Sequence, residues 1–110
     1  MPYLKINHDV AKATYEEIEL PPDSFLKACY EAIGCRYIEV APTVLRGLVL
    51  IIDEEAKLSG DWHTRVNQTA TQLYGSSWDC IVGDVILARA QGEHLVPLTA
   101  QDVQRVTELL

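Results

Sequence analysis

The acidic run Asp53-Glu54-Glu55 is the densest group of chemically active side chains in the sequence, and it directly follows an aliphatic segment. Carboxylates in such a cluster can move protons or hold a hard cation. Calcium loops, however, place oxygen ligands at alternating positions around a sharp glycine turn, and the run lacks that spacing. We expect no metal site here. We interpret the run as a solvated turn whose three carboxylates can meet a basic protein surface through complementary charge.

A second group follows within a few residues, at a predicted helix start. Free backbone N–H groups there, together with Arg65, can hold an anion, and the ring of Trp62 can stack on a planar ligand. The candidate ligand-binding residues are therefore Trp62, His63, Arg65 and Asn67. An enzymatic alternative gives His63 the role of a base that Asp61 orients. The simplest alternative is a helix start that caps itself and a tryptophan at the edge of the core.

The remaining reactive side chains match no catalytic or metal-binding motif. The three cysteines are Cys29, Cys35 and Cys80, and none forms a C-x-x-C pair, so we expect free thiols that pack in the core. The histidines are His8, His63 and His94, and no two of them are spaced to share a helix face as zinc ligands. No G-x-S-x-G elbow is present. We therefore predict no catalytic residue and no cofactor.

Charge and the aliphatic runs limit the expected partners. Nine Lys and Arg against sixteen Asp and Glu give a formal net charge of −7, which repels nucleic-acid phosphates and favours basic partners. The longest aliphatic run, Leu48 to Ile52, is far shorter than the roughly 20 residues of a membrane-spanning helix. The N-terminus lacks the pattern of a signal peptide. We expect a cytoplasmic protein that does not contact membranes or bind nucleic acid directly, and that can form homo-oligomers.

The composition is that of an ordinary globular domain. The chain has 110 residues, of which 48% are hydrophobic and 23% charged. This length suffices for one hydrophobic core and is too short for two. We expect a single domain over residues 1 to 110.

The first half of the chain is predicted to contain two strands, a helix and two more strands. Tyr3 to Asn7 and Thr14 to Leu20 alternate between polar and apolar residues, as half-buried strands do. The segment Pro21-Pro22-Asp23-Ser24 ends the second strand and supplies a helix cap. The helix has an apolar face of Leu26, Cys29, Tyr30 and Ile33, and it ends before Gly34. Arg36 to Ala41 and Arg46 to Asp53 then form adjacent strands, the second with two apolar faces.

The second half is predicted to contain a helix, a strand and a helix. Asp61 caps a continuous helix whose buried face is Trp62, Val66, Thr69, Ala70 and Leu73, and Gly75 ends it. Cys80 to Ala88 is a buried strand that leaves through the turn Gln91-Gly92-Glu93. Thr99 and Asp102 form a capping box before a helix with Val103, Val106 and Leu110 on one face. The order ββ-α-ββ-α-β-α predicts an α+β fold, with a mostly antiparallel sheet of about five strands covered by two to three helices.

Several short segments together resemble an uncharacterised domain family that is common in phages and conjugative elements. They are Tyr37-Ile38-Glu39-Val40, the run from Gly47 to Gly60, Asn67-Gln68-Thr69-Ala70-Thr71 and Ile81-Val82-Gly83-Asp84-Val85. In that family a Y-I-E-V-like strand precedes a strand that ends in a D/N-E-E-G-K-like turn, and this chain has Ala56 where glycine is usual. It also has Thr64-Arg65-Val66 in place of a frequent proline pair. None of these segments is catalytic.

The resemblance implies an accessory protein of a phage or mobile element. Our preferred hypothesis is a non-enzymatic binding module that blocks a host protein or sequesters a small anionic or planar ligand. One alternative is a small enzyme that acts on a nucleotide or nucleic-acid intermediate, and another is a structural or assembly protein.

Overall fold

The computed structural model describes residues 2–12 and 14–110 of the chain. Within these residues one six-stranded antiparallel sheet packs with three α-helices, so the predicted α+β class and element order are confirmed. The elements are β1 (Tyr3–Ile6), β2 (Tyr15–Ile18), α1 (Phe25–Ile33), β3 (Ile38–Pro42), β4 (Leu48–Asp53), α2 (Gln68–Tyr74), β5 (Val85–Gln91), β6 (His94–Val96) and α3 (Ala100–Leu109). None of the helices in the described part of the chain is long and apolar enough to cross a bilayer.

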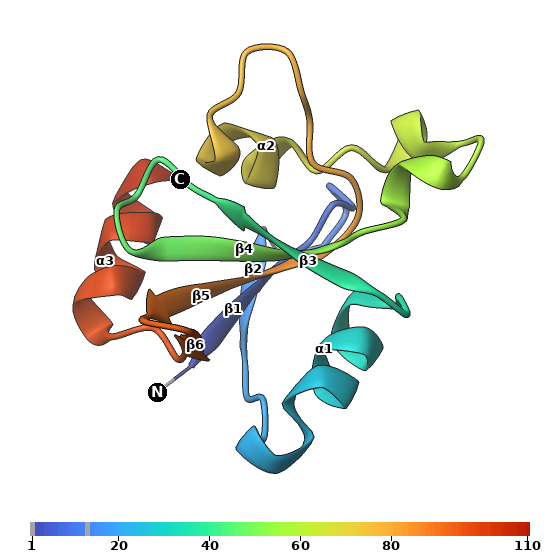
Figure 1. Cartoon of the computed structure of the whole chain (residues 1–110). Coiled ribbons are helices and arrows are strands. Elements are labelled where there is room, and N and C mark those ends of the chain that lie inside the picture. Colours follow the sequence, from blue (N-terminus) through green and yellow to red (C-terminus); the bar gives the residue numbers. More distant parts are fainter. Residues whose placement is uncertain (1, 13) are drawn as a thin grey trace.

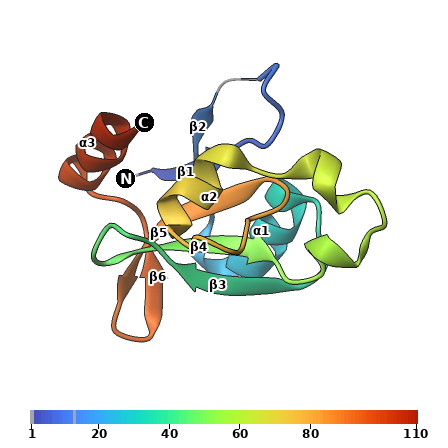
Figure 2. The ribbon, with the colours of Figure 1, turned by 90° about the horizontal axis from the view of Figure 1, so that it is seen from above.

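The sheet has the order β2-β1-β5-β4-β3, and the short strand β6 pairs with the C-terminal end of β5 (Figures 1 and 2). The strands β2 and β3 therefore lie at the two ends of this order, and among the described strands β6 pairs with β5 alone. Helix α1 lies on one face, while α2 and α3 lie on the other (Figure 1). Strand β4 lies inside the sheet between β3 and β5, which explains why both of its faces are apolar.

Each face of the sheet carries its own hydrophobic cluster. Side chains alternate across a strand, so in β4 Leu48 and Leu50 pack beneath α2 and α3, while Ile51 packs against α1. All three are at most 2% exposed. The larger cluster joins α2 and α3 to the sheet through Leu73 and Val106. The division of side chains between the two faces determines which residues of β3 and β4 lie on the same side of the sheet as α2.

The apolar face of α1 is rotated from the predicted one. Phe25, Ala28, Cys29, Ala32 and Ile33 pack against the sheet, whereas Leu26 is 54% exposed. The prediction for Leu26 was wrong because Phe25 at the neighbouring position places its ring beside Tyr3, with ring centroids 5.9 Å apart. Ser24 precedes the helix but makes no side-chain capping hydrogen bond, so the predicted cap there was also wrong.

The predicted continuous helix after Asp61 is broken in two. A short 3₁₀ helix, Trp62–Arg65, is followed by extended backbone at Val66, and α2 begins only after Asn67. Asn67 is the N-cap of α2, because its side-chain oxygen accepts a hydrogen bond from the backbone N–H of Ala70 at 2.9 Å. Asp61 makes no side-chain cap. The prediction of one continuous helix was wrong because Val66 keeps the helical spacing of apolar residues although its backbone is extended. A bridge to Val82 accompanies this extended conformation.

The strand predicted for Cys80 to Ala88 starts later than expected, at Val85. The apolar residues before it are buried without joining the ladder. Ile81 donates its backbone N–H to the hydroxyl of Thr71 at 2.9 Å, and Val82 makes only an isolated bridge with Val66. The predicted turn Gln91-Gly92-Glu93 leads into β6, a strand that the sequence reading did not include.

The capping box of α3 is confirmed and extends into a charged network. Thr99 and Asp102 exchange backbone-to-side-chain hydrogen bonds, as predicted. The carboxylate of Asp102, which is 1% exposed, also accepts hydrogen bonds from Arg89 at 2.7 and 2.5 Å and lies 3.5 Å from Arg105. Leu110, predicted on the apolar face of this helix, is instead 41% exposed.

Candidate functional site

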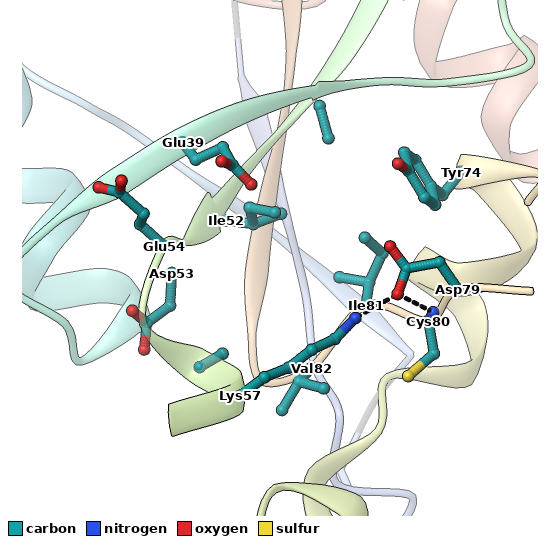
Figure 3. A pocket seen from close by; sticks show the side chains of 12 residues that line it. Glu39, Ile52, Asp53, Glu54, Lys57, Tyr74, Asp79, Cys80, Ile81 and Val82 are labelled. Carbon is teal, nitrogen blue, oxygen red and sulfur yellow. Dashed lines mark hydrogen bonds and ion pairs between the residues drawn. The ribbon is translucent and has the colours of Figure 1, made fainter. Parts of the chain in front are cut away.

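A small cavity of ≈ 130 Å³ opens where β3 and β4 extend beyond the cover of α2, and we call it the acidic pocket (Figure 3). Its polar lining comes from Glu39, Asp53, Glu54, Lys57, Tyr74, Asp79 and Cys80. Its apolar lining comes from Ala41, Ile52, Ala56, Ile81 and Val82. Four of the five charged groups are carboxylates, so the pocket concentrates negative charge over an apolar floor.

The sheet register places Glu39 at this pocket. Glu39 pairs with Ile52 across β3 and β4, and cross-strand partners share one face of a sheet. That face is the one covered by α2, and Tyr74 is the last residue of that helix. Figure 3 shows the Glu39 carboxylate above Ile52, with the ring of Tyr74 on the other side of the cavity. The apolar floor and the carboxylate therefore come from adjacent strands.

The turn after α2 brings the remaining wall into place. Gly75 ends the helix with φ +79°, a conformation that L side chains rarely adopt. A Cβ at this position would lie 2.4 Å from Cγ1 of Val44, so the close approach of α2 to the β3–β4 loop also requires glycine. After this turn, Asp79 and Cys80 line the pocket.

The charges of the pocket are unevenly compensated. Lys57 donates a hydrogen bond to the carboxylate of Asp79, and this contact raises the pKa of Lys57 and lowers the pKa of Asp79. Asp79 also accepts the backbone N–H of Cys80 at 2.8 Å. By contrast, the carboxylates of Glu39 and Glu54 make no ion pair or hydrogen bond with any residue among 2–12 and 14–110. Lys57, the one cation among the described lining residues, is thus already neutralised, and negative charge remains.

This arrangement suits a small cationic group with an apolar stem. A lysine or arginine side chain carries its charge at the end of a methylene chain, which can lie on apolar surface while the charged end meets a carboxylate. The face of Tyr74 adds a site for a cation–π contact. Among the described residues, no group of three or more His, Cys, Asp or Glu side chains is placed to hold a metal ion.

The structure divides the acidic run that the sequence singled out. Asp53 and Glu54 line the pocket, but their carboxylates point away from its centre in Figure 3. Asp53 also accepts the backbone N–H of Glu55 at 2.9 Å. The Glu55 carboxylate pairs with Arg36, whose Nε donates at 2.9 Å. The run therefore offers two carboxylates at the pocket rim and a third that is already paired.

The four predicted ligand-binding residues do not share one surface. Trp62 is half-buried and its ring meets His63 edge-on, with centroids 6.0 Å apart. Arg65 donates from Nη2 to the backbone oxygen of Ala56 at 3.3 Å. Asn67 is 0% exposed, and besides capping α2 it donates from Nδ2 to the carbonyls of Ile6 and Gly83. Its amide is thus occupied by the fold itself.

The sequence suggested His63 and Asp61 as a pair. The hydrogen bond from Ser59 is the largest cause of a lowered pKa of Asp61, and His63 is among the charges that also lower it. The structure also brings another histidine and aspartate together. His8 Nδ1 lies 2.7 Å from Oδ1 of Asp84, which also accepts the His8 backbone N–H at 2.9 Å. Burial raises the pKa of Asp84, but the hydrogen bonds from His8 outweigh this effect and leave the pKa below its usual value. The two residues are 76 positions apart, so no local motif could reveal the pair. His8 and His63 both border a cleft of ≈ 460 Å³.

A larger hollow, a groove of ≈ 610 Å³, lies between β2 and α1, and it lacks the charge selectivity of the acidic pocket. Its floor includes Ile18 and Leu20, while its charged rim mixes both signs: Lys5, Glu16, Glu19, Lys27 and Glu31. Lys5 and Glu16 already lie 3.9 Å apart as an ion pair. We therefore treat the smaller pocket as the candidate site.

All three cysteines are free thiols, as predicted from the sequence. Their environments differ. Cys29 is fully buried, and burial raises its pKa to about 11. Cys35 is only partly buried, which departs from the expected core position, and burial again raises its pKa. Cys80 is partly exposed at the acidic pocket and not in a strand. It is the only one of these cysteines that lines this pocket.

Sequence reasoning did not single out Glu39 or the Lys57–Asp79 pair. Glu39 occupies the polar position of an alternating strand, which is typical of any solvent-facing residue. What places Glu39 at the pocket is its position opposite Ile52. That position becomes known only when the pairing of β3 with β4 is known.

Comparisons with known proteins give a family and no further relative. No curated protein matches the chain, and no solved structure does. A family profile described as "Domain of unknown function (DUF3846)" matches residues 3–110. The chain therefore belongs to this family of domains of unknown function.

Proposed function

We propose that the protein is a non-enzymatic binding domain that recognises a basic segment of a partner protein by taking a lysine or arginine side chain into the acidic pocket. The observation that carries this proposal is the Glu39 carboxylate, which stands over the apolar floor without a partner among the residues that the structure describes. Glu54 and Asp53 add negative charge at the rim. An incoming cation supplies the partner that the carboxylates of Glu39 and Glu54 lack among the described residues.

Electrostatics and size both support a side chain as the ligand. A charge-assisted hydrogen bond is about twice as strong as a neutral one, and an arginine can form two in parallel with one carboxylate. The cavity of ≈ 130 Å³ is much smaller than the roughly 300 to 1,000 Å³ of pockets that enclose whole drug-sized ligands. A single side-chain end from a larger partner suits this volume better than a planar small molecule does.

The proposed setting is an accessory role in a phage or mobile element, in which the partner is a host protein. Support for this setting comes from the resemblance of the segments around Glu39, Asp53, Asn67 and Val82 to a family that is common in such elements. The net charge of −7 favours association with a basic partner, and such association weakens as salt screens it.

Isothermal titration with a minimal probe tests the proposal. The probe is the capped peptide Ac-Gly-Gly-Arg-Gly-Gly-NH₂, and its citrulline analogue has nearly the same shape but no charge. We expect the arginine peptide to bind at least tenfold more tightly than the citrulline peptide, and to lose this advantage with the variant Glu39→Gln/Glu54→Gln. A variant of equal charge change away from the pocket, Glu17→Gln/Glu93→Gln, serves as the matched control and should bind as the unmodified protein does.

A second readout locates the bound peptide. Alkylation of Cys80 by iodoacetamide should slow when the arginine peptide is bound, because Cys80 lines the pocket. Alkylation of Cys35, which does not line the pocket, should proceed at an unchanged rate and acts as an internal control. Equal affinity for the arginine and citrulline peptides, or equal weakening by the two double variants, would show that the proposal is wrong.

A further inference from the structure

The strand that carries Glu39 is also an open edge of the sheet. Among the strands of the described residues, β3 pairs with β4 only, and Figure 2 shows it along one margin of the sheet. The backbone groups of an edge strand that do not face its neighbour are available to another strand. The acidic pocket is thus next to a row of unpaired backbone donors and acceptors.

The hydrogen-bond pattern identifies these groups. The Glu54 N–H donates to the Tyr37 carbonyl at 3.1 Å, so this residue pair is of the hydrogen-bonded type. Hydrogen-bonded and non-hydrogen-bonded pairs alternate along an antiparallel ladder. Glu39 and Ala41 therefore bond to β4, whereas Ile38 and Val40 direct their N–H and C=O groups outward. Pro42, the next outward residue, has no N–H and ends the row of donors.

The side chains along this edge are suited to a partner strand. Tyr37 is 53% exposed and Val40 is 48% exposed, which leaves apolar surface beside the outward backbone groups. The opposite edge, β2, has the sequence Tyr-Glu-Glu-Ile, and charged side chains of this kind discourage strand addition. The two edges therefore differ in how readily they accept a strand.

We infer that the partner's basic segment binds as an extended strand added to the edge of β3, with its lysine or arginine opposite Glu39. This inference rests on the proposed function and names the form of the partner. A residue opposite Glu39 has its side chain on the same face as Glu39 and so reaches the acidic pocket. The residues on either side of it bond to the backbone of Ile38 and Val40. The recognised pattern is an apolar residue, a basic residue and another apolar residue.

A second copy of this chain fits the same edge less well. If two β3 strands pair about Glu39, the two glutamates stand directly opposite each other, and like charges at that spacing are destabilising. If they pair about Val40, each Ile38 carbonyl meets Pro42, which has no N–H to donate. A segment with a basic residue at the central position avoids both conflicts.

Amide hydrogen exchange measured by NMR tests the inference with the capped peptide Ac-Thr-Val-Arg-Val-Thr-NH₂. When the peptide is saturating, we expect the amide protons of Ile38 and Val40 to exchange at least tenfold more slowly. N-methylation of both valines removes the donors that face β3 and should abolish this protection. N-methylation of the arginine, whose N–H points away from β3, is the matched control and should preserve the protection.

The protein itself provides an independent variant. Val40→Pro removes one outward N–H but no bond to β4, and proline is tolerated at such positions of edge strands. This variant should lose at least tenfold in affinity for the valine-containing peptide. If it fails to fold, the two N-methylated peptides still decide the matter.

The possible failures are distinguishable. If the glycine-flanked arginine peptide binds at the pocket but the valine-containing peptide gives no protection of Ile38 and Val40, the strand-addition inference is wrong and the proposed function stands. If neither peptide prefers the charged side chain, both are wrong. Protection that appears without peptide and rises with protein concentration would assign the edge to a second copy, and protection at Tyr15 and Glu17 would assign the partner to β2. Either result would overturn the inference.

Discussion

Two carboxylates of this domain, Asp102 and Glu39, have opposite relations to the fold. Asp102 is almost fully buried, and it accepts hydrogen bonds from Arg89 and from the backbone of Thr99. Glu39 is exposed beside an apolar floor and has no partner among the described residues. Charges that are buried with partners hold elements together, whereas charges left without partners are available for binding. Substitutions at the two kinds of position should therefore change different measured quantities.

The largest loss of stability is expected for substitution of Asn67. In contrast to the exposed carboxylates of the pocket, its side chain is buried and fully hydrogen-bonded. Asn67→Ala removes the cap of α2 and the donor to two buried carbonyls, which should lower the free energy of unfolding by roughly 3 kcal/mol. Urea unfolding followed by circular dichroism measures this change. The exposed neighbour Gln68 provides the control, because Gln68→Ala should alter stability by less than about 0.5 kcal/mol. Similar losses in the two variants would contradict the assigned role of Asn67.

A loss of roughly 2 kcal/mol at neutral pH is expected for Asp102→Asn, which weakens the hydrogen bonds to Arg89 and the capping box. The hydrogen bond from Arg89 is the largest cause of a lowered pKa of Asp102. A lowered pKa means that this stabilisation is complete above the unfolded-state pKa of about 3.9 and is lost as pH falls through the folded-state value. The difference between the two proteins should therefore shrink only in strong acid, as urea unfolding at several pH values can measure. A difference that declines already between pH 7 and 5 would contradict this assignment.

At the pocket, the comparison predicts almost no change in stability. Glu39→Gln/Glu54→Gln removes two charges that have no partner within residues 2–12 and 14–110, so the free energy of unfolding should change by less than about 0.5 kcal/mol per site. Reduced repulsion among the carboxylates favours a small increase. Thermal unfolding at low and high salt checks this result. A clear loss of stability would mean that Glu39 belongs with Asp102 as a structural charge.

The smallest effect concerns thiol reactivity in the native protein. Burial raises the pKa of Cys29 to about 11, so the thiolate needed for alkylation is scarce at neutral pH. We expect iodoacetamide to modify Cys80 and Cys35 first, and Cys29 only after unfolding. Peptide mass spectrometry after timed labelling shows the order. Early modification of Cys29 would indicate that α1 opens readily from the sheet.

The fold could be predicted wherever local patterns agree with tertiary packing. The two-sided apolar run of β4 indicated an interior strand, and the Thr99–Asp102 spacing indicated the start of α3. The pattern failed at Leu26, because Phe25 and Leu26 both stand at helical spacing from Cys29 and Ile33, and spacing alone does not choose between them. It also failed where Val66 takes an extended conformation inside an apparent helix, since the cause is a bridge to Val82 that local spacing does not contain.

The candidate site was predictable only in part for the same reason. Asp53 and Glu54 were identified because they are adjacent in sequence, and they do line the pocket. Glu39 reaches the same pocket through strand pairing, and His8 meets Asp84 through the packing of distant segments. Sequence proximity also misled, since Glu55 turns to Arg36 and Asn67 turns inward. Contacts between residues that are far apart in the sequence therefore decide which side chains reach the same site.

The three side-chain hydrogen bonds of Asn67 also have a consequence for the order of folding. Its amide joins α2 to Ile6 and Gly83, which lie 61 and 16 positions away in the chain. A helix as short as α2 is unstable alone in water, because isolated helices below about 12 residues are marginal. We therefore expect α2 to form late, after β1 has docked on β5 to present the carbonyl of Ile6, and to be lost together with the sheet in one cooperative step. Such coupling makes the wall of the acidic pocket as durable as the central strands.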